Sequence, residues 1–142
     1  MHSGHGSKRL LVIHGGGIGD LLLTFPAMAA LRARYTIDLA GLPSRAVLAS
    51  IWGLVENTLS IDHLDFGSVF TLPSERLREA LRPYTEALVW MRDEDGRIAR
   101  GLGEAGLARV HCYPGIPPDT WRGHASLYFQ DCAAEVLGAP LR

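Results

Sequence analysis

The segment that decides the fold reads RLLVIHGGGIGD and covers residues 9–20. Four consecutive aliphatic side chains, Leu10 to Ile13, are followed by four glycines within positions 15–19 and then by Asp20. A continuous aliphatic run that ends at glycines is typical of a strand covered on both faces. Apolar residues then recur at helical spacing from Leu21 to Leu31. The segment therefore predicts a central β-strand, a glycine-rich turn and a helix.

Strand and helix patterns alternate along the rest of the chain. Predicted strands cover residues 37–42, 58–61, 86–91 and 109–112, and predicted helices cover residues 44–52, 75–82, 97–105 and 125–137. Ser74 is the predicted N-cap of the second of these helices. Pro26 either kinks the first helix or marks its late start, and residues 65–71 are ambiguous, with a loop as the interpretation. The alternation predicts an α/β fold, a Rossmann-like open parallel sheet with helices on both faces.

Length and composition restrict the possible functions. The 142 residues suit one domain, which we assign to residues 8–142, with residues 1–7 as a tail or tag remnant. The net charge of −1 provides no basic field for nucleic acid, so no nucleic-acid partner is expected. Cys112 and Cys132 lack the spacing of a metal or redox motif. No apolar run reaches the roughly 18 residues that span a bilayer, and a signal peptide is not recognisable, which predicts a cytoplasmic protein.

The turn from His14 to Asp20 is the predicted ligand site, because ligands of open parallel sheets collect at the carboxyl ends of the strands. A dinucleotide fingerprint fails in both registers, since Asp20 or Leu22 stands at the position of the third glycine. A phosphate-binding loop fails because no Lys-Ser or Lys-Thr follows the glycines. From the local sequence alone, Asp20 fits a helix cap as well as it fits a functional carboxylate.

The same residues resemble the opening motif of family 9 glycosyltransferases, which are heptosyltransferase-like enzymes of lipopolysaccharide biosynthesis. The specific part covers Arg9 to His14, Gly17 to Asp20 and Leu21 to Met28, and a weaker similarity returns at residues 124–138. Residues 89–93 depart from the family, because the Asp-x-Gln expected there is missing. The resemblance implies the N-terminal, acceptor-side half of a GT-B glycosyltransferase. The C-terminal donor-binding domain is then absent from this chain.

The resemblance also implies a mechanism and a set of site residues. Asp20 is the expected general base of an inverting transfer from an ADP-heptose-type nucleotide sugar, which is a co-substrate, so that neither a cofactor nor a metal is expected. The expected substrate-binding residues are Gly17, Ile18, Gly19, His14, Arg45, Arg92 and Arg97. The three arginines are expected to contact phosphate or carboxylate groups of the acceptor, with an ordinary surface charge as the alternative for each. A packed histidine is the alternative for His14.

Partners follow from the same resemblance. The expected acceptor is a glycolipid or oligosaccharide, such as the lipopolysaccharide core, and the resemblance allows peripheral association with the inner face of the bacterial inner membrane. This half alone is expected to be inactive. The main alternative is a stand-alone, non-catalytic Rossmann-like module that binds a glycan, a nucleotide or a protein partner. A fragment of a nucleotide-dependent oxidoreductase or epimerase is a third interpretation, which depends only on the order of strand, glycine turn and helix.

Overall fold

Five parallel strands form the sheet of the computed structural model, which describes residues 8–140. The strands are β1 (Lys8–His14), β2 (Tyr35–Gly41), β3 (Asn57–Ser60), β4 (Glu86–Trp90) and β5 (Arg109–Tyr113), in the spatial order β3-β2-β1-β4-β5. The predicted α/β, Rossmann-like class is confirmed, and each predicted strand lies within two residues of its observed bounds. The predicted tail of residues 1–7 lies outside the described residues.

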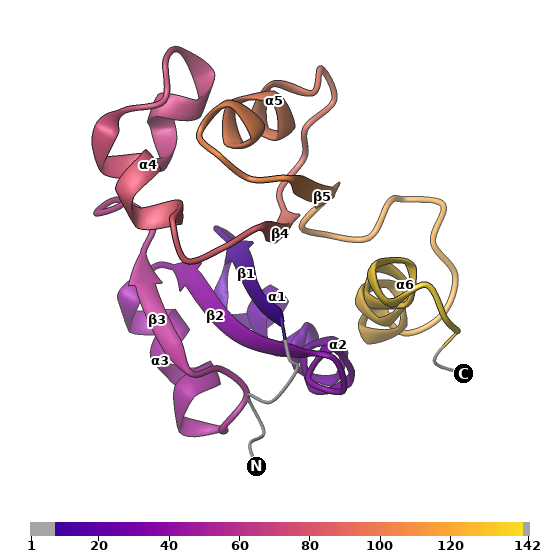
Figure 1. The fold of residues 1–142 in the computed structure, drawn as a ribbon. Helices are drawn as coiled ribbons and strands as arrows, with labels where there is room; N and C mark the ends of the chain where they lie inside the picture. Colours follow the sequence, from indigo (N-terminus) through magenta and orange to yellow (C-terminus); the bar gives the residue numbers. More distant parts are fainter. Residues whose placement is uncertain (1–7, 141–142) are drawn as a thin grey trace.

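Helices cover both faces of the sheet (Figure 1). One face carries α1 (Ile18–Leu23), α2 (Phe25–Leu31), α3 (Pro43–Ile51) and α6 (Ala125–Leu137); the other carries the 3₁₀ helix η1 (Phe66–Phe70), α4 (Glu75–Leu81) and α5 (Arg97–Glu104). The side chains of β1 alternate between these two cores, with Leu10 and Val12 in the first and Leu11 and Ile13 in the second. All four are fully buried, as expected of a central strand.

The first helical stretch is broken into two helices at Thr24. The Thr24 hydroxyl donates a 2.6 Å hydrogen bond to the Leu21 carbonyl oxygen, and the side chain is fully buried. Pro26 lies in the first turn of α2, where its missing amide costs no helical hydrogen bond. Pro26 therefore marks the late start of a second helix, which decides between the two interpretations of this proline.

Residues 66–70 form a 3₁₀ helix, which corrects the interpretation of the segment 65–71 as a loop. Asp65 adopts the left-handed conformation, with φ of 57°, and η1 follows it directly. Phe66 and Val69 are one 3₁₀ turn apart and both are buried. A Cβ atom on Gly101 of α5 would lie 2.4 Å from the Val69 carbonyl oxygen, so only glycine permits this close contact between α5 and η1.

Two carboxylates are buried toward the amino ends of the strands. Asp38 of β2 is 2% exposed and accepts hydrogen bonds from Arg9 Nη1 at 2.9 and 3.1 Å, from the Tyr84 hydroxyl at 2.6 Å and from the Asn57 amide at 3.1 Å. Glu86 of β4 is 4% exposed and lies 2.6 Å from His111 Nε2, and the Tyr35 hydroxyl donates to it at 3.1 Å. Both clusters join neighbouring strands of the sheet.

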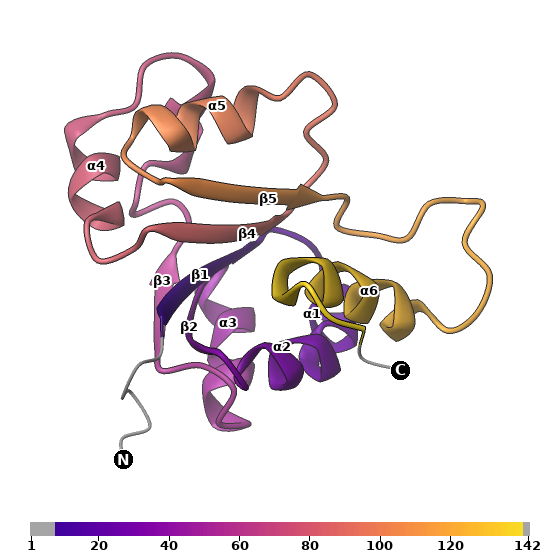
Figure 2. The ribbon, with the colours of Figure 1, turned by 45° about the vertical axis from the view of Figure 1, so that its right-hand side comes forward.

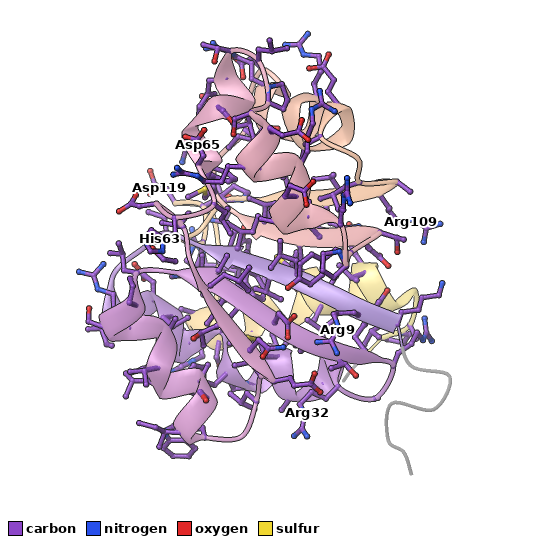
Figure 3. The ribbon with its side chains drawn as sticks, turned by 60° about the vertical axis from the view of Figure 1, so that its left-hand side comes forward. Arg9, Arg32, His63, Asp65, Arg109 and Asp119 are labelled. Atoms are coloured by element: carbon purple, nitrogen blue, oxygen red, sulfur yellow. The ribbon has the colours of Figure 1, made fainter. Side chains whose placement is uncertain are left out.

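The two ends of the sheet carry different connections. In Figure 3, Arg9 and Arg109 mark the amino ends of the strands, and His63, Asp65 and Asp119 mark the opposite side, where the loops leave the carboxyl ends. The segment between β5 and α6 runs outward from the sheet before the chain returns to pack α6 beside α1 and α2 (Figure 2). None of the helices within residues 8–140 is long and apolar enough to cross a membrane.

Candidate functional site at the switch point of the sheet

The strand order reverses beside β1, and this makes the carboxyl ends of β1 and β4 the candidate ligand site. The chain moves from β1 through β2 to β3 in one direction and then returns to place β4 on the other side of β1. His14 and Trp90, the last residues of β1 and β4, are paired neighbours. A Cβ atom on Gly15 would lie 2.6 Å from Met91 Cε, so the loops that follow these strands touch. Such a switch point is the usual ligand position in open α/β sheets.

Asp20 lies in the first turn of α1, above the glycine-rich turn. The N-cap of α1 is Gly17, and no side chain makes a cap hydrogen bond there. Among residues 8–140, no donor forms a hydrogen bond to the half-buried Asp20 carboxylate. A Cβ atom on Gly16 would lie 3.8 Å from Asp20 Cβ, which places the aspartate beside the turn. Asp20 therefore does not cap the helix and keeps its capacity to accept a proton or a hydrogen bond.

Gly17, the N-cap of α1, and Ile18 and Gly19, its first two residues, form an open helix end, so the predicted turn from His14 to Asp20 ends earlier than expected. All three are exposed, and Ile18 is 44% exposed. A Cβ atom added to Gly17 or to Gly19 would meet no other atom within 4 Å. A larger residue would therefore fit at either position without a clash inside the protein. The absence of side chains leaves the backbone accessible to an approaching molecule.

His14 lies beneath the turn and is 4% exposed. Its Nδ1 accepts a 3.3 Å hydrogen bond from the Gly16 amide, while Nε2 is buried and has no hydrogen-bond partner among the described residues. Burial lowers the pKa of His14; the negative charge of Asp20 opposes this shift and the positive charge of Arg45 adds to it. The ring is therefore neutral at pH 7. His14 therefore holds the backbone of the turn through the Gly16 amide.

The three predicted arginines lie in different surroundings. Arg45 of α3 donates from Nη1 to the Gly16 carbonyl oxygen at 3.2 Å. Arg92 follows Met91 directly; its side chain is 62% exposed and its Nη1 lies 3.6 Å from Glu94. Arg97 donates to the Phe70 carbonyl oxygen at 3.1 Å and stacks its guanidinium 5.5 Å above the Phe70 ring. The structure thus gathers His14, Arg45 and Asp20 around Gly16, and directs Arg97 toward η1.

Asp93 has a role that the sequence interpretation missed. Its carboxylate accepts hydrogen bonds from the amides of Ile98 at 2.8 Å and Ala99 at 3.0 Å, so it holds the first turn of α5. An acidic residue a few positions before a predicted helix is the signal that could have indicated this. Asp93 and burial also raise the pKa of the Cys112 thiol to about 12, with burial as the larger cause. That thiol is protonated at pH 7 and is therefore a poor nucleophile.

Residues 8–140 contain no group of three or more His, Cys, Asp and Glu side chains that could hold a metal ion.

No family model matches the sequence, and no curated protein matches it. Solved structures do match. The chain is similar to E. coli ADP-heptose lps heptosyltransferase II, with a TM-score of 0.63 and 19% identity over 88% of this chain and 40% of that one.

A glycosyl transferase family 9 structure from Veillonella parvula DSM 2008 is equally similar, with a TM-score of 0.63 and 16% identity over 94% of this chain and 42% of that one. The chain has the fold of one domain of a family 9 glycosyltransferase. The resemblance carried by residues 9–28 is confirmed at the level of the fold. The chain spans about 40% of the length of the two proteins it matches.

Proposed function

We propose that this chain is the acceptor-side half of a heptosyltransferase-like glycosyltransferase, with Asp20 as the general base. One observation carries the proposal: a half-buried carboxylate without a hydrogen-bonding donor among the described residues lies at the switch point of a fold shared with two family 9 structures. Asp93 differs, because its carboxylate accepts two backbone amides of α5 and so serves the fold.

The proposed reaction is an inverting transfer. An acceptor hydroxyl attacks the anomeric carbon of an ADP-heptose-type sugar from the face opposite the nucleotide, so the new glycosidic bond forms as the bond to the diphosphate breaks. The Asp20 carboxylate takes the hydroxyl proton. The open backbone of Gly17 and Gly19 lets the acceptor approach Asp20 without a side chain in the way.

Arg92 is the best candidate among the arginines to contact an acceptor phosphate, such as those of a lipopolysaccharide core. It directly follows the residue that touches Gly15, and within residues 8–140 its ion pair is the long contact with the exposed Glu94. Arg45 and Arg97 already donate to protein carbonyl oxygens. We expect Arg92→Ala to raise the KM for a phosphorylated acceptor about tenfold, a loss of one charge-assisted hydrogen bond, with little effect from Arg97→Ala.

Because this chain spans about 40% of the similar proteins, the donor-binding half is proposed to be a second domain. The test is a transfer assay on the full-length protein with ADP-heptose and a heptose-deficient lipopolysaccharide core. Asp20→Asn should lower kcat at least a hundredfold, in the range of one lost general base, and Asp62→Asn, which changes an exposed carboxylate, should retain the wild-type rate. Near wild-type turnover in Asp20→Asn would reject Asp20 as the base. Acceptor binding without any turnover in the wild-type protein would favour a non-catalytic binding module.

A further inference from the structure

The backbone N–H and C=O of Gly16 are each held by a side chain, and the two side chains come from different elements. The Gly16 amide donates to His14 Nδ1 at the end of β1, and its carbonyl oxygen accepts from Arg45 Nη1 on α3. The turn contains exposed glycines and therefore has little side-chain packing of its own. Two hydrogen bonds, one to the peptide group on each side of Gly16, therefore restrain this residue.

Gly16 is also the point at which the turn meets Asp20. A Cβ atom at Gly16 would lie 3.0 Å from His14 Cε1 on one side and 3.8 Å from Asp20 Cβ on the other. The next residue, Gly17, is the N-cap of α1 and accepts the Leu21 amide at 3.0 Å. A displacement of Gly16 is therefore transmitted directly to the helix end that carries Asp20.

We propose that His14 and Arg45 are positioning residues that clamp the backbone of Gly16 and so fix the place of Asp20, and that protonation of His14 opens this clamp. The effect on transfer depends on the proposed function of Asp20. The clamp itself depends only on the two hydrogen bonds, so it can be tested without any substrate.

The chemistry of imidazole makes the clamp sensitive to pH. In the neutral ring, Nδ1 can accept the Gly16 amide only if the hydrogen is on Nε2, which is buried without a partner among the described residues. In the imidazolium ion both nitrogens carry hydrogen. Nδ1 is then a donor that faces another donor, the Gly16 N–H, and the hydrogen bond is lost. One proton thus removes one of the two restraints on Gly16.

The charged groups that face His14 come from two helices. Asp20 of α1 favours the protonated ring, and Arg45 of α3 and burial disfavour it. The neighbouring residues of β2 and β4, Leu39 and Trp90, are uncharged. Because the folded-state pKa of His14 is lowered, the stability it contributes is fully present above the unfolded value of about 6.5 and is lost as the pH falls through the folded value. The clamp is therefore closed at neutral pH and opens in acid.

Amide hydrogen exchange of residues 15–20, followed by NMR, tests the clamp. In the wild-type protein we expect the protection factor of the Gly16 amide to fall about fivefold to tenfold between pH 7.5 and the acid side of the His14 titration, the equivalent of one net hydrogen bond. His14→Asn should keep the protection at both pH values, since an Asn side-chain oxygen accepts from the amide two residues later and does not titrate. His14→Leu should lose it at both.

Arg45→Met tests the second hydrogen bond of the clamp, and Arg100→Met, on the exposed side of α5, is the matched control. We expect Arg45→Met to lower the Gly16 protection factor severalfold and Arg100→Met to leave it unchanged. The proposal is overturned if the protection of Gly16 does not depend on pH, or if the pH dependence survives in His14→Asn. If His14→Leu does not fold, the Asn variant alone decides. A clamp confirmed in a protein without transferase activity would reject the proposed function and leave this inference standing.

Discussion

The carboxylates at the two ends of the sheet differ in burial and in hydrogen bonding. At the amino end, Asp38 and Glu86 are 2% and 4% exposed, and each has hydrogen-bonding partners from other strands or loops. At the carboxyl end, Asp20 is half-buried and has no hydrogen-bonding donor among residues 8–140. Gly16, Gly17 and Gly19 precede it in the sequence, and Gly16 lies beside it.

This difference separates carboxylates that hold the fold from one that is available to a ligand. A buried carboxylate without partners is strongly destabilising, so the fold can retain Asp38 and Glu86 only because their oxygens are satisfied. Asp20 keeps access to solvent and so can remain without a protein partner. The comparison predicts that substitutions at the amino end change stability and that those at the carboxyl end change function.

The largest expected effect on stability is that of Asp38→Ala. The change leaves the Tyr84 hydroxyl and the Asn57 amide without their acceptor and removes the partly buried pair with Arg9. We expect the free energy of unfolding to fall by about 3–5 kcal/mol, as for other broken buried pairs. Urea denaturation measures the loss, with Asp62→Asn as the exposed control. A loss below about 1 kcal/mol would remove the distinction between the two ends.

Glu86→Gln should have a smaller effect, because the amide keeps the shape and part of the hydrogen bonding. Its neutral oxygen is a weaker acceptor for the Tyr35 hydroxyl and for His111 Nε2. We expect a loss of about 1–3 kcal/mol in urea denaturation at pH 7. A more stable Glu86→Gln variant would show that this carboxylate is not retained for stability.

Tyr84→Phe should cost about 1 kcal/mol, the net value of one hydrogen bond to Asp38. It also tests a pH dependence. Burial, followed by the hydrogen bond to Asp38 and its charge, raises the pKa of Tyr84 in the folded state. The stability that this hydroxyl contributes is therefore full below the unfolded value of about 10 and is lost as the pH rises above it. Between pH 8 and pH 11, the free energy of unfolding should fall less steeply with pH in Tyr84→Phe than in the wild-type protein.

Gly19→Ala has a small expected effect on stability, and its sign is opposite to that of the three substitutions above. An added Cβ meets nothing within 4 Å, and alanine favours the helical conformation of α1. We expect the free energy of unfolding to stay level or to rise by up to about 1 kcal/mol, while transfer by the full-length protein falls because the methyl group occupies the approach to Asp20. Unchanged transfer would indicate that the acceptor does not pass over this part of the turn.

Local patterns in the sequence predicted most of the fold. The aliphatic run at Leu10 to Ile13 predicted the central strand, and Ser74 does cap α4 by accepting the Leu77 amide at 3.1 Å. The 3₁₀ helix η1 was missed, because five residues are too short to show a helical period and its buried faces contact the distant Gly101. The sequence left open whether Pro26 kinks one helix or starts a second. The structure decides this, because the helix breaks at the buried Thr24.

The candidate site was predicted less completely than the fold. The position of Asp20 follows from the strand and turn before it. In the site, the bond between Arg45 and Gly16 joins residues 29 positions apart, and at the other end of the sheet the bond between Tyr84 and Asp38 joins residues 46 apart. Neither leaves a local pattern in the sequence. Tertiary geometry also decides that Arg97 faces Phe70 and that His14 lies beneath the turn, because a strand end alone does not say which way a side chain points.

The most direct test of the central claim measures stability and transfer on the same Asp20→Asn variant of the full-length protein. If Asp20 is kept for chemistry, the free energy of unfolding should change by no more than about 0.5 kcal/mol while transfer from ADP-heptose is lost. A variant that retains near wild-type transfer, or that loses as much stability as the protein loses at Asp38, would contradict the account.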